Sequence, residues 1–288
     1  MLNAFLKLTS LVLVLLTIHG CASKPEKPEG KPKAKTAQSG PKKPKKYLDI
    51  PIDTAISSRI RFPKGSRSVD DVLEAFGPQA THQLRPYFSK AGVAYPPRDV
   101  TFIAIKDEKK LELWARDSGA FKLIRPYPIK AASGMRGPKL KQGDRQVPEG
   151  IYHISRLNPN SNYHLSMKVD YPNQFDRDHA LDEGRTDLGG DIFIHGKAVS
   201  AGCLAMGDAA IEELFVLAAE VGTDNIRVII SPSDPRLRPL DLTHPSLPDW
   251  TSDLYAEITR EIFEVTRAKP PIKLARSSVH NPIYRPAN

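Results

Sequence analysis

Alternating apolar and polar residues dominate the middle of the chain and predict a β-rich core. Residues 100–105 are followed by a turn at Asp107-Glu108 and by residues 111–115, where apolar and polar positions alternate, so the two runs predict a β-hairpin. Further strands are expected at residues 121–124, 150–154, 191–195 and 226–230. The pattern predicts a mixed α+β domain in which β-structure dominates, with helical additions at both ends.

Helical periodicity precedes the β-rich part. Ser68 is placed to cap a helix over residues 69–76, and Gly77 suits its end. A second helix is expected over residues 78–90. Residues 47–97 are therefore expected to form a small helical region that comes before the main domain at 98–232.

Two more helices are expected nearer the C-terminus. Residues 208–221 are amphipathic, with Asp208 as the expected N-cap and with Glu212 and Glu213 favouring the positive end of the helix dipole. The last segment, residues 233–288, is Pro-rich at first and then predicts a helix over about 249–268.

The first 21 residues have the pattern of a lipoprotein signal peptide. An apolar core of roughly 11 residues is too short for a spanning helix of about 20 residues. It ends in Ile18-His19-Gly20-Cys21, which resembles a bacterial lipobox, so Cys21 is the expected lipidation site. Ala22, rather than Asp, follows the cysteine, and this resembles a lipoprotein that is sorted to the outer membrane. We therefore expect an exported chain that is anchored at the periplasmic face of the outer membrane. A secretory signal with an incidental cysteine is the alternative.

Most of the positive charge lies near the N-terminus. The chain has a net charge of +9, and residues 22–46 contain nine Lys and two Glu among Pro, Gly, Ala and Ser. This composition predicts a disordered linker, because it offers almost no apolar surface to bury. From Tyr47 onward the chain is nearly neutral, so its charge gives no reason to expect a nucleic-acid partner.

One cysteine has neighbours that suit nucleophilic catalysis. With Cys21 assigned to lipid, Cys203 is the only thiol left. A thiol with a pKa of about 8.5 needs a base to react at neutral pH, and His195 ends a predicted strand a short loop away. Gly196 and Gly202 allow a close backbone approach, and the N–H groups near Gly202 and Cys203 are expected to face a developing oxyanion.

The sequence His-Gly-x3-Ser-x-Gly-Cys at 195–203 resembles the active-site signature of the YkuD-type L,D-transpeptidases. Further blocks resemble the YafK-type branch of that family, at residues 137–140, 143–152, 157–161 and 171–173. The resemblance covers about residues 98–232 and implies a β-rich L,D-transpeptidase fold.

The resemblance also implies a chemistry. Cys203 would be the nucleophile and His195 the general base, with the Gly196 carbonyl orienting the imidazole and Ser200 supporting the loop. The implied substrate is a peptidoglycan stem peptide, whose acyl group would form a thioester with Cys203. No metal or organic cofactor is implied, and the sequence contains no metal-ligand spacing such as HExxH.

The second half of the reaction is open. An amine acceptor would give a crosslink or attach a protein to the wall, whereas water would release a terminal D-amino acid or a wall-linked lipoprotein. Many relatives carry a histidine where this chain has Ala201 and an arginine where it has Ala205. Loss of that arginine removes a cation that could pair with a substrate carboxylate.

Five further residues are candidates for substrate binding. Four cations lie in or between the resembling blocks and are hypothesised to bind stem-peptide carboxylates, and one histidine is a candidate for the cleft: Lys139, Arg145, Arg177, Arg185 and His164. For each cation the alternative is a solvated surface charge, and for the histidine it is a structural position in a strand.

Two alternative functions belong to other classes of protein. A catalytically silent lipoprotein that tethers the membrane to peptidoglycan would explain the lipobox and the basic linker, but it does not need the 195–203 motif. A papain-like protease is disfavoured, because in that class the cysteine precedes the histidine by a long interval.

Overall fold

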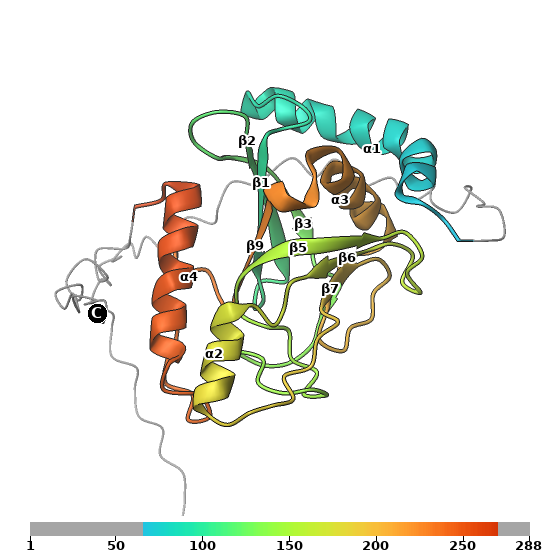
Figure 1. Ribbon diagram of the computed structural model, residues 1–288. Helices are drawn as coiled ribbons and strands as arrows, with labels where there is room; N and C mark the ends of the chain where they lie inside the picture. Colours follow the sequence, from blue (N-terminus) through green and yellow to red (C-terminus); the bar gives the residue numbers. More distant parts are fainter. Residues whose placement is uncertain (1–65, 270–288) are drawn as a thin grey trace, which may run out of the picture. The chain divides into compact units, whose positions relative to one another are not determined.

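The computed structural model describes residues 66–269 (Figure 1). The expected signal peptide, Cys21, the linker and the last 19 residues, 270–288, lie outside this range, so those expectations remain predictions. Within the described residues the chain has the expected mixed α+β fold, and its strands form one nine-stranded sheet. No helix in this range is both long enough and apolar enough to cross a membrane.

The bounds of the elements follow the chain. The strands are β1 (Asp99–Ile105), β2 (Lys110–Arg116), β3 (Lys122–Pro128), β4 (Ala131–Ala132), β5 (Gly150–Asn158), β6 (Ser166–Val169), β7 (Phe193–His195), β8 (Leu204–Ala205) and β9 (Ile226–Ser231). The helices are α1 (Val69–Ala91), α2 (Gln174–Asp182), α3 (Asp208–Val221) and α4 (Thr251–Thr266), with a 3₁₀ turn η1 (Thr223–Asn225).

The sheet runs β3-β2-β1-β9-β5-β6-β7-β8-β4. β1 is parallel to β9 and β7 is parallel to β8, whereas the other neighbours are antiparallel. The β1–β2 hairpin and the strands expected near residues 121, 150, 191 and 226 are confirmed. The sequence did not predict β4, β6 and β8, which have only two to four residues each, nor did it predict α2.

The expectation of two helices before the sheet is wrong, because α1 is one continuous helix. Ser68 caps it as expected, in a capping box with Asp71. The helix runs through Gly77 and Pro78 and ends only at Gly92, whose φ of 67° suits a glycine. Pro78 is exposed and removes one hydrogen bond, but the buried side of α1 continues past it and outweighs that loss.

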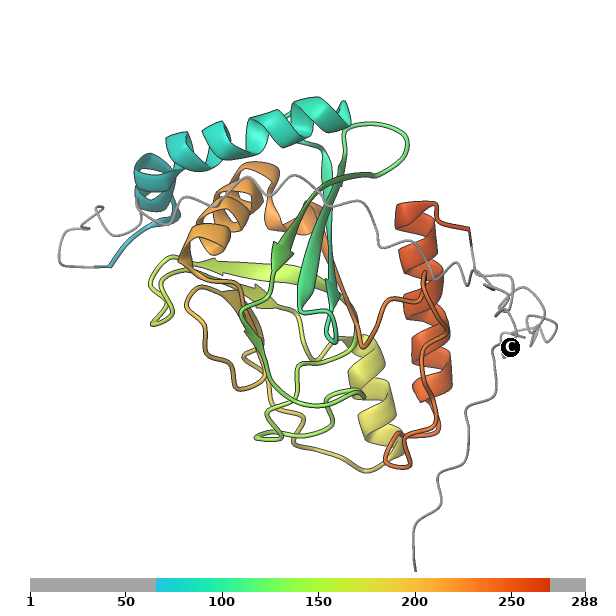
Figure 2. The same ribbon diagram turned by 180° about the vertical axis from the view of Figure 1, so that it is seen from behind.

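The helices cover both faces of the sheet (Figures 1 and 2). α1 and α3 lie next to each other on one side, and their buried residues share one core cluster with the sheet. α4 packs on the other side. β1 serves both clusters because its side chains alternate: Phe102 faces the α1–α3 side, and Ile103 faces α4. The described part of the expected small helical region, α1, thus shares one core with the sheet.

α3 spans the expected residues, but its first turn differs from the expectation. Gly207 is the N-cap, and the Asp208 carboxylate accepts instead from the backbone N–H of Lys197 (2.7 Å). Glu213 is buried and accepts from Arg125 (2.9 Å) and Tyr127 (2.7 Å). The glutamates of α3 therefore meet specific side-chain partners in addition to any dipole effect.

Truncation of a buried side chain on α1 tests whether this helix belongs to the core. Leu84 is fully buried in the cluster that also contains the sheet, so Leu84→Ala is expected to lower the free energy of unfolding by about 2–5 kcal/mol. Exposed His82 on the same helix is the matched control, and His82→Ala is expected to change stability by less than about 0.5 kcal/mol. Equal urea midpoints for both variants would mean that α1 is a separate unit.

Candidate active site

The pairing of β7 with β8 brings His195 and Cys203 to the same face of the sheet. In this parallel pair Ile194 lies opposite Leu204, so Phe193 lies level with Cys203, one residue before β8. Side chains alternate along a strand, so Phe193, His195 and Cys203 lie on one face of the sheet. Ile194 and Leu204 point to the other face and are fully buried in the core.

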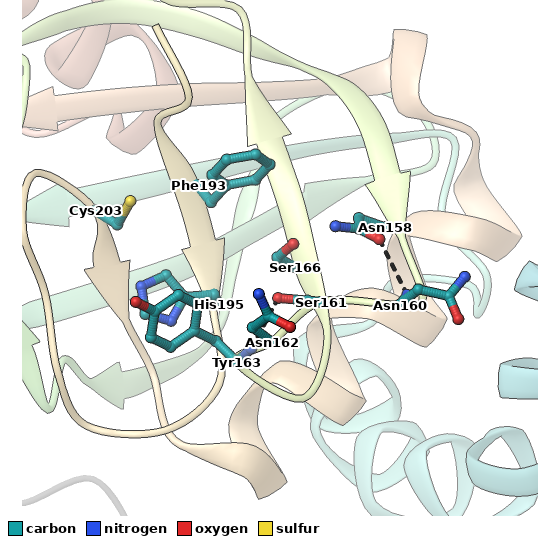
Figure 3. A pocket seen from close by; sticks show the side chains of 9 residues that line it. All are labelled: Asn158, Asn160, Ser161, Asn162, Tyr163, Ser166, Phe193, His195 and Cys203. Carbon is teal, nitrogen blue, oxygen red and sulfur yellow. Dashed lines mark hydrogen bonds between the residues drawn. The ribbon is translucent and has the colours of Figure 1, made fainter. Parts of the chain in front are cut away.

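His195 and Cys203 line the same pocket, which has a volume of about 210 Å³ (Figure 3). Its remaining walls come from β7, from β6 and from the end of β5 with the loop that follows. They are Phe193, Ser166, Asn158, Asn160, Ser161, Asn162 and Tyr163. Among the described residues, the lining thus consists of amides, hydroxyls and aromatic rings around the thiol and the imidazole.

The His195 imidazole is held in one tautomer. Nδ1 lies 2.6 Å from the carbonyl oxygen of Gly196, and a carbonyl oxygen only accepts, so Nδ1 carries the proton. Nε2 is then the basic nitrogen. His195 is 2% exposed, and burial lowers its pKa although the hydrogen bond to Gly196 acts in the opposite direction. The expectation that this carbonyl orients the imidazole agrees with the geometry.

Burial raises the pKa of the Cys203 thiol. A backbone hydrogen bond from Phe193 and the charge of Lys139 lower this pKa, whereas the charge of Asp191 raises it further. The thiol donates to the carbonyl oxygen of Asp191, with 3.6 Å between Sγ and oxygen. The resting pair at neutral pH is therefore a neutral thiol and a neutral imidazole. Proton transfer requires the thiol hydrogen to turn from Asp191 toward Nε2.

The loop before Cys203 is closed by serine hydroxyls. The Ser200 hydroxyl donates to the Cys203 carbonyl (2.6 Å) and accepts from the Cys203 N–H (3.1 Å), which agrees with its expected supporting role. The Gly202 N–H donates to the hydroxyl of Ser133 (2.6 Å). Both N–H groups that were expected to face an oxyanion thus already have hydroxyl acceptors, which corrects that expectation.

Ser133 is a residue that the sequence analysis did not single out. Its hydroxyl donates to the Arg145 carbonyl (2.7 Å), accepts from Gly202 and lies 3.3 Å from the Ser200 hydroxyl. It ties together the segment after β4, the segment before β5 and the cysteine loop. No local sequence signal predicts this, because the three segments are far apart along the chain.

Gly196 is needed for a close approach. A Cβ on this residue would lie 2.6 Å from the Tyr163 carbonyl oxygen and 2.7 Å from Oδ1 of Asp208, closer than real Cβ atoms come. The β5–β6 loop and the start of α3 therefore both press on the residue that orients His195. Gly202 has a φ of +116°, a conformation that side-chain-bearing residues rarely adopt.

None of the four candidate cations lines this pocket in the described part of the chain. Lys139 is buried and pairs with Asp144 (2.5 Å), so it reaches Cys203 only through its charge. Arg185 pairs with Glu183 (2.6 Å) and donates to the Leu140 carbonyl (2.9 Å).

The other candidates also lie outside the lining of the pocket. Arg145 and Arg177 are exposed, and Arg177 donates to the Pro172 carbonyl and to the Gln174 side chain. His164 is turned away from the pocket, with its Nε2 2.7 Å from Oε1 of Glu212 on α3. Its structural alternative agrees with this geometry.

The walls that sequence reasoning missed come from the cross-strand register. Ser166 on β6 lies opposite His195 on β7, and Asn158 on β5 lies opposite Ser166, so the three share a face. Predicting this required the pairing of β6, a strand of four residues that the sequence pattern did not reveal.

In residues 66–269, no group of three or more His, Cys, Asp or Glu side chains is arranged to hold a metal ion.

Residues 99–230 match the model of the YkuD family, the L,D-transpeptidase catalytic domain. The chain is 36% identical over 132 residues to the Escherichia coli (strain K12) protein named "Putative L,D-transpeptidase YafK". This match covers 44% of this chain and 51% of the relative, so the chain spans about half the length of the curated relative.

Two solved structures are also similar to part of the chain. The helical cell shape determining protein Pgp2 from Campylobacter jejuni is 23% identical, with a TM-score of 0.40, and the match covers 53% of this chain and 56% of that one. Bd1075 from Bdellovibrio bacteriovorus is 20% identical, with a TM-score of 0.35, and the match covers 58% of this chain and 56% of that one.

The neutral resting pair predicts how Cys203 responds to pH. In a Cys21→Ser chain, which leaves one thiol, the rate of alkylation by iodoacetamide is expected to rise about tenfold per pH unit from pH 6 to 8, because the thiolate is the nucleophile and the pKa is raised. The urea-denatured chain is the control, and the midpoint of its alkylation rate as a function of pH should lie at a lower pH. A rate plateau already present at pH 6 would indicate a thiolate–imidazolium pair and contradict the prediction.

The close approach at Gly196 predicts an asymmetric pair of glycine variants. Gly196→Ala is expected to lower the free energy of unfolding by about 1–3 kcal/mol, because the new methyl group displaces the Tyr163 carbonyl or Asp208. Gly190→Ala is the matched control, because a Cβ there meets nothing within 4 Å. Urea unfolding measures both, and equal losses would argue against the steric account.

Proposed function

Residues 99–230 belong to the YkuD family of L,D-transpeptidase catalytic domains, and from this premise we propose that the chain is a peptidoglycan acyltransferase with Cys203 as nucleophile and His195 as general base. The observation that carries the proposal is that both side chains line one pocket while the Gly196 carbonyl fixes Nδ1 of the imidazole. The proposed substrate is a stem peptide of the cell wall, and the proposed intermediate is a thioester.

The first step transfers one proton and exchanges one bond. Nε2 of His195 takes the thiol proton as Sγ of Cys203 attacks the carbonyl carbon of an amide bond after an L-configured centre. The C–N bond then breaks, and the imidazolium returns its proton to the leaving amine. The acyl group is left on sulfur as a thioester, and the leaving group departs as a neutral amine.

The second step returns the thiol. An amine acceptor loses a proton to Nε2 as it attacks the thioester carbon, the C–S bond breaks, and Cys203 regains the proton. A stem-peptide amine gives a crosslink, and a protein amine gives attachment of that protein to the wall. The fixed tautomer supports both steps, because the same nitrogen accepts and returns the proton.

Hydrolysis of the same thioester is the second candidate function. Ala205, at the position where many relatives carry arginine, is fully buried, and no Lys or Arg lines the pocket among the described residues. Without such a cation an acceptor carboxylate has no ionic partner there, which favours water as acceptor. In that case the chain would release a terminal D-amino acid or a wall-linked lipoprotein.

The location and partners proposed for the chain rest on the sequence. We propose lipidation at Cys21, anchoring at the periplasmic face of the outer membrane, and a reach into the wall through the linker at 22–46. The alternative from another class is a lipoprotein that tethers membrane to wall without catalysis. That alternative predicts that sacculus binding survives Cys203→Ala with no change in wall chemistry.

Muropeptide analysis tests the proposed function. Purified sacculi treated with the full chain should lose stem-peptide donors, and Cys203→Ala should abolish the change, because the thioester cannot form. With a free D-amino acid added, exchange of the terminal residue would indicate transfer and simple loss would indicate hydrolysis. If wild type and Cys203→Ala leave all muropeptides and an isolated protein–wall conjugate equally unchanged, the catalytic proposal fails.

A further inference from the structure

Tyr163 covers the proposed base on its solvent side. The ring centroids of Tyr163 and His195 are 4.5 Å apart with the planes tilted by 38° (Figure 3). Tyr163 itself is 43% exposed, whereas His195 is 2% exposed. The tyrosine ring therefore separates the imidazole from bulk water, although it lies on a loop between β5 and β6.

The next residue holds this loop from behind. His164 has a φ of +76°, which is unusual for a residue other than glycine and costs free energy. Its Nε2 lies 2.7 Å from Oε1 of Glu212, and its ring meets Phe76 of α1 edge to face, with 5.5 Å between the centroids. Glu212 is 8% exposed and is fixed by α3. The pair is thus a rigid attachment that keeps His164 turned toward the helices while Tyr163 stays over the pocket.

A second attachment lies earlier in the same loop. Asn160 accepts from the backbone N–H of Arg67 (2.7 Å) and donates to the Arg67 carbonyl (2.7 Å). The Arg67 guanidinium also donates to the His164 carbonyl oxygen (3.0 Å). The loop is therefore set by groups outside the pocket, on α3 and just before α1.

We propose that Glu212 is a positioning residue for the catalytic base. Through His164 it keeps the loop 158–164 in the conformation that places Tyr163 over His195, and Tyr163 in turn keeps water off the imidazole. The proposal assumes the role of His195 given under the proposed function, and it adds a residue on α3 that does not line the pocket.

The consequence is a change in the proton affinity of His195. Burial lowers the pKa of this imidazole, so admission of water is expected to raise it toward its usual value of 6.5. The other titratable side chains that the contacts bring near are Cys203 in the pocket, Tyr163 and His164 on the loop, Lys197 after β7, and Asp208 and Glu212 on α3. Tyr163→Ala removes the ring over His195 together with its contact to Lys197, whose Nζ lies 5.9 Å from the ring centroid, whereas Tyr163→Phe keeps the ring.

The test is an NMR titration of the His195 imidazole in the full chain carrying Cys203→Ala, where the imidazole titrates without a coupled thiol. Tyr163→Ala is expected to raise the pKa of His195, and Tyr163→Phe, which keeps the ring, is expected to leave it unchanged. Glu212→Ala is expected to raise it as well. Glu212→Gln keeps an acceptor for His164 and is expected to leave the pKa of His195 as it is in the Cys203→Ala chain.

The double variant separates positioning from general loosening. If Glu212 acts through Tyr163, Glu212→Ala adds no further shift in a Tyr163→Ala chain. Additive shifts, or an unchanged pKa in Glu212→Ala beside a raised one in Tyr163→Ala, would overturn the role of Glu212. An unchanged pKa in Tyr163→Ala would overturn the cover itself. If Glu212→Ala does not fold, Glu212→Asp, which withdraws the carboxylate by one methylene, replaces it with the same expectations.

This titration does not require turnover. A chain that fails to change muropeptides but still shows the expected shifts would contradict the proposed function alone. A chain that acts on muropeptides but shows no shift in any variant would contradict the positioning role alone.

Discussion

The parallel pairing of β7 with β8 is the constraint on which the site depends. It puts His195 and Cys203 on one face of the sheet, while Ile194 and Leu204, fully buried on the other face, fix the register. A slip of one residue would turn Cys203 into the core, because strand side chains alternate in direction. A hydrophobic pair on the far side thus determines whether Cys203 and His195 face the same pocket.

Burial then sets the electrostatics of the pair. Partial removal from water lowers the pKa of His195 and raises the pKa of Cys203, so both groups rest in their neutral forms. The Gly196 carbonyl gives this neutral imidazole a single tautomer, in which Nε2 is the unprotonated nitrogen. The elements around it serve that arrangement: hydroxyls of Ser133 and Ser200 close the cysteine loop, and Tyr163 covers the imidazole.

The sequence was sufficient where the signal is local. The β1–β2 hairpin, the span of α3 and the His195–Cys203 spacing could all be read from short windows. It was insufficient where tertiary packing overrides a local rule, as in α1, which continues through Gly77 and Pro78. The pocket walls could not be predicted either, because they depend on cross-strand register. The sequence also does not reveal which candidate cations are engaged in ion pairs. Lys139, for example, pairs with Asp144 inside the protein.

Acylation of Cys203 distinguishes a catalytic chain from a silent one, and intact-mass spectrometry of the chain after brief incubation with a purified stem-peptide donor detects it. We expect a mass increase on Cys203 equal to the donor minus its leaving amine, which hydroxylamine removes and which is strongly reduced in His195→Ala. An unmodified Cys203 in a folded chain that nevertheless consumes the donor would contradict this expectation, as would equal acylation of His195→Ala.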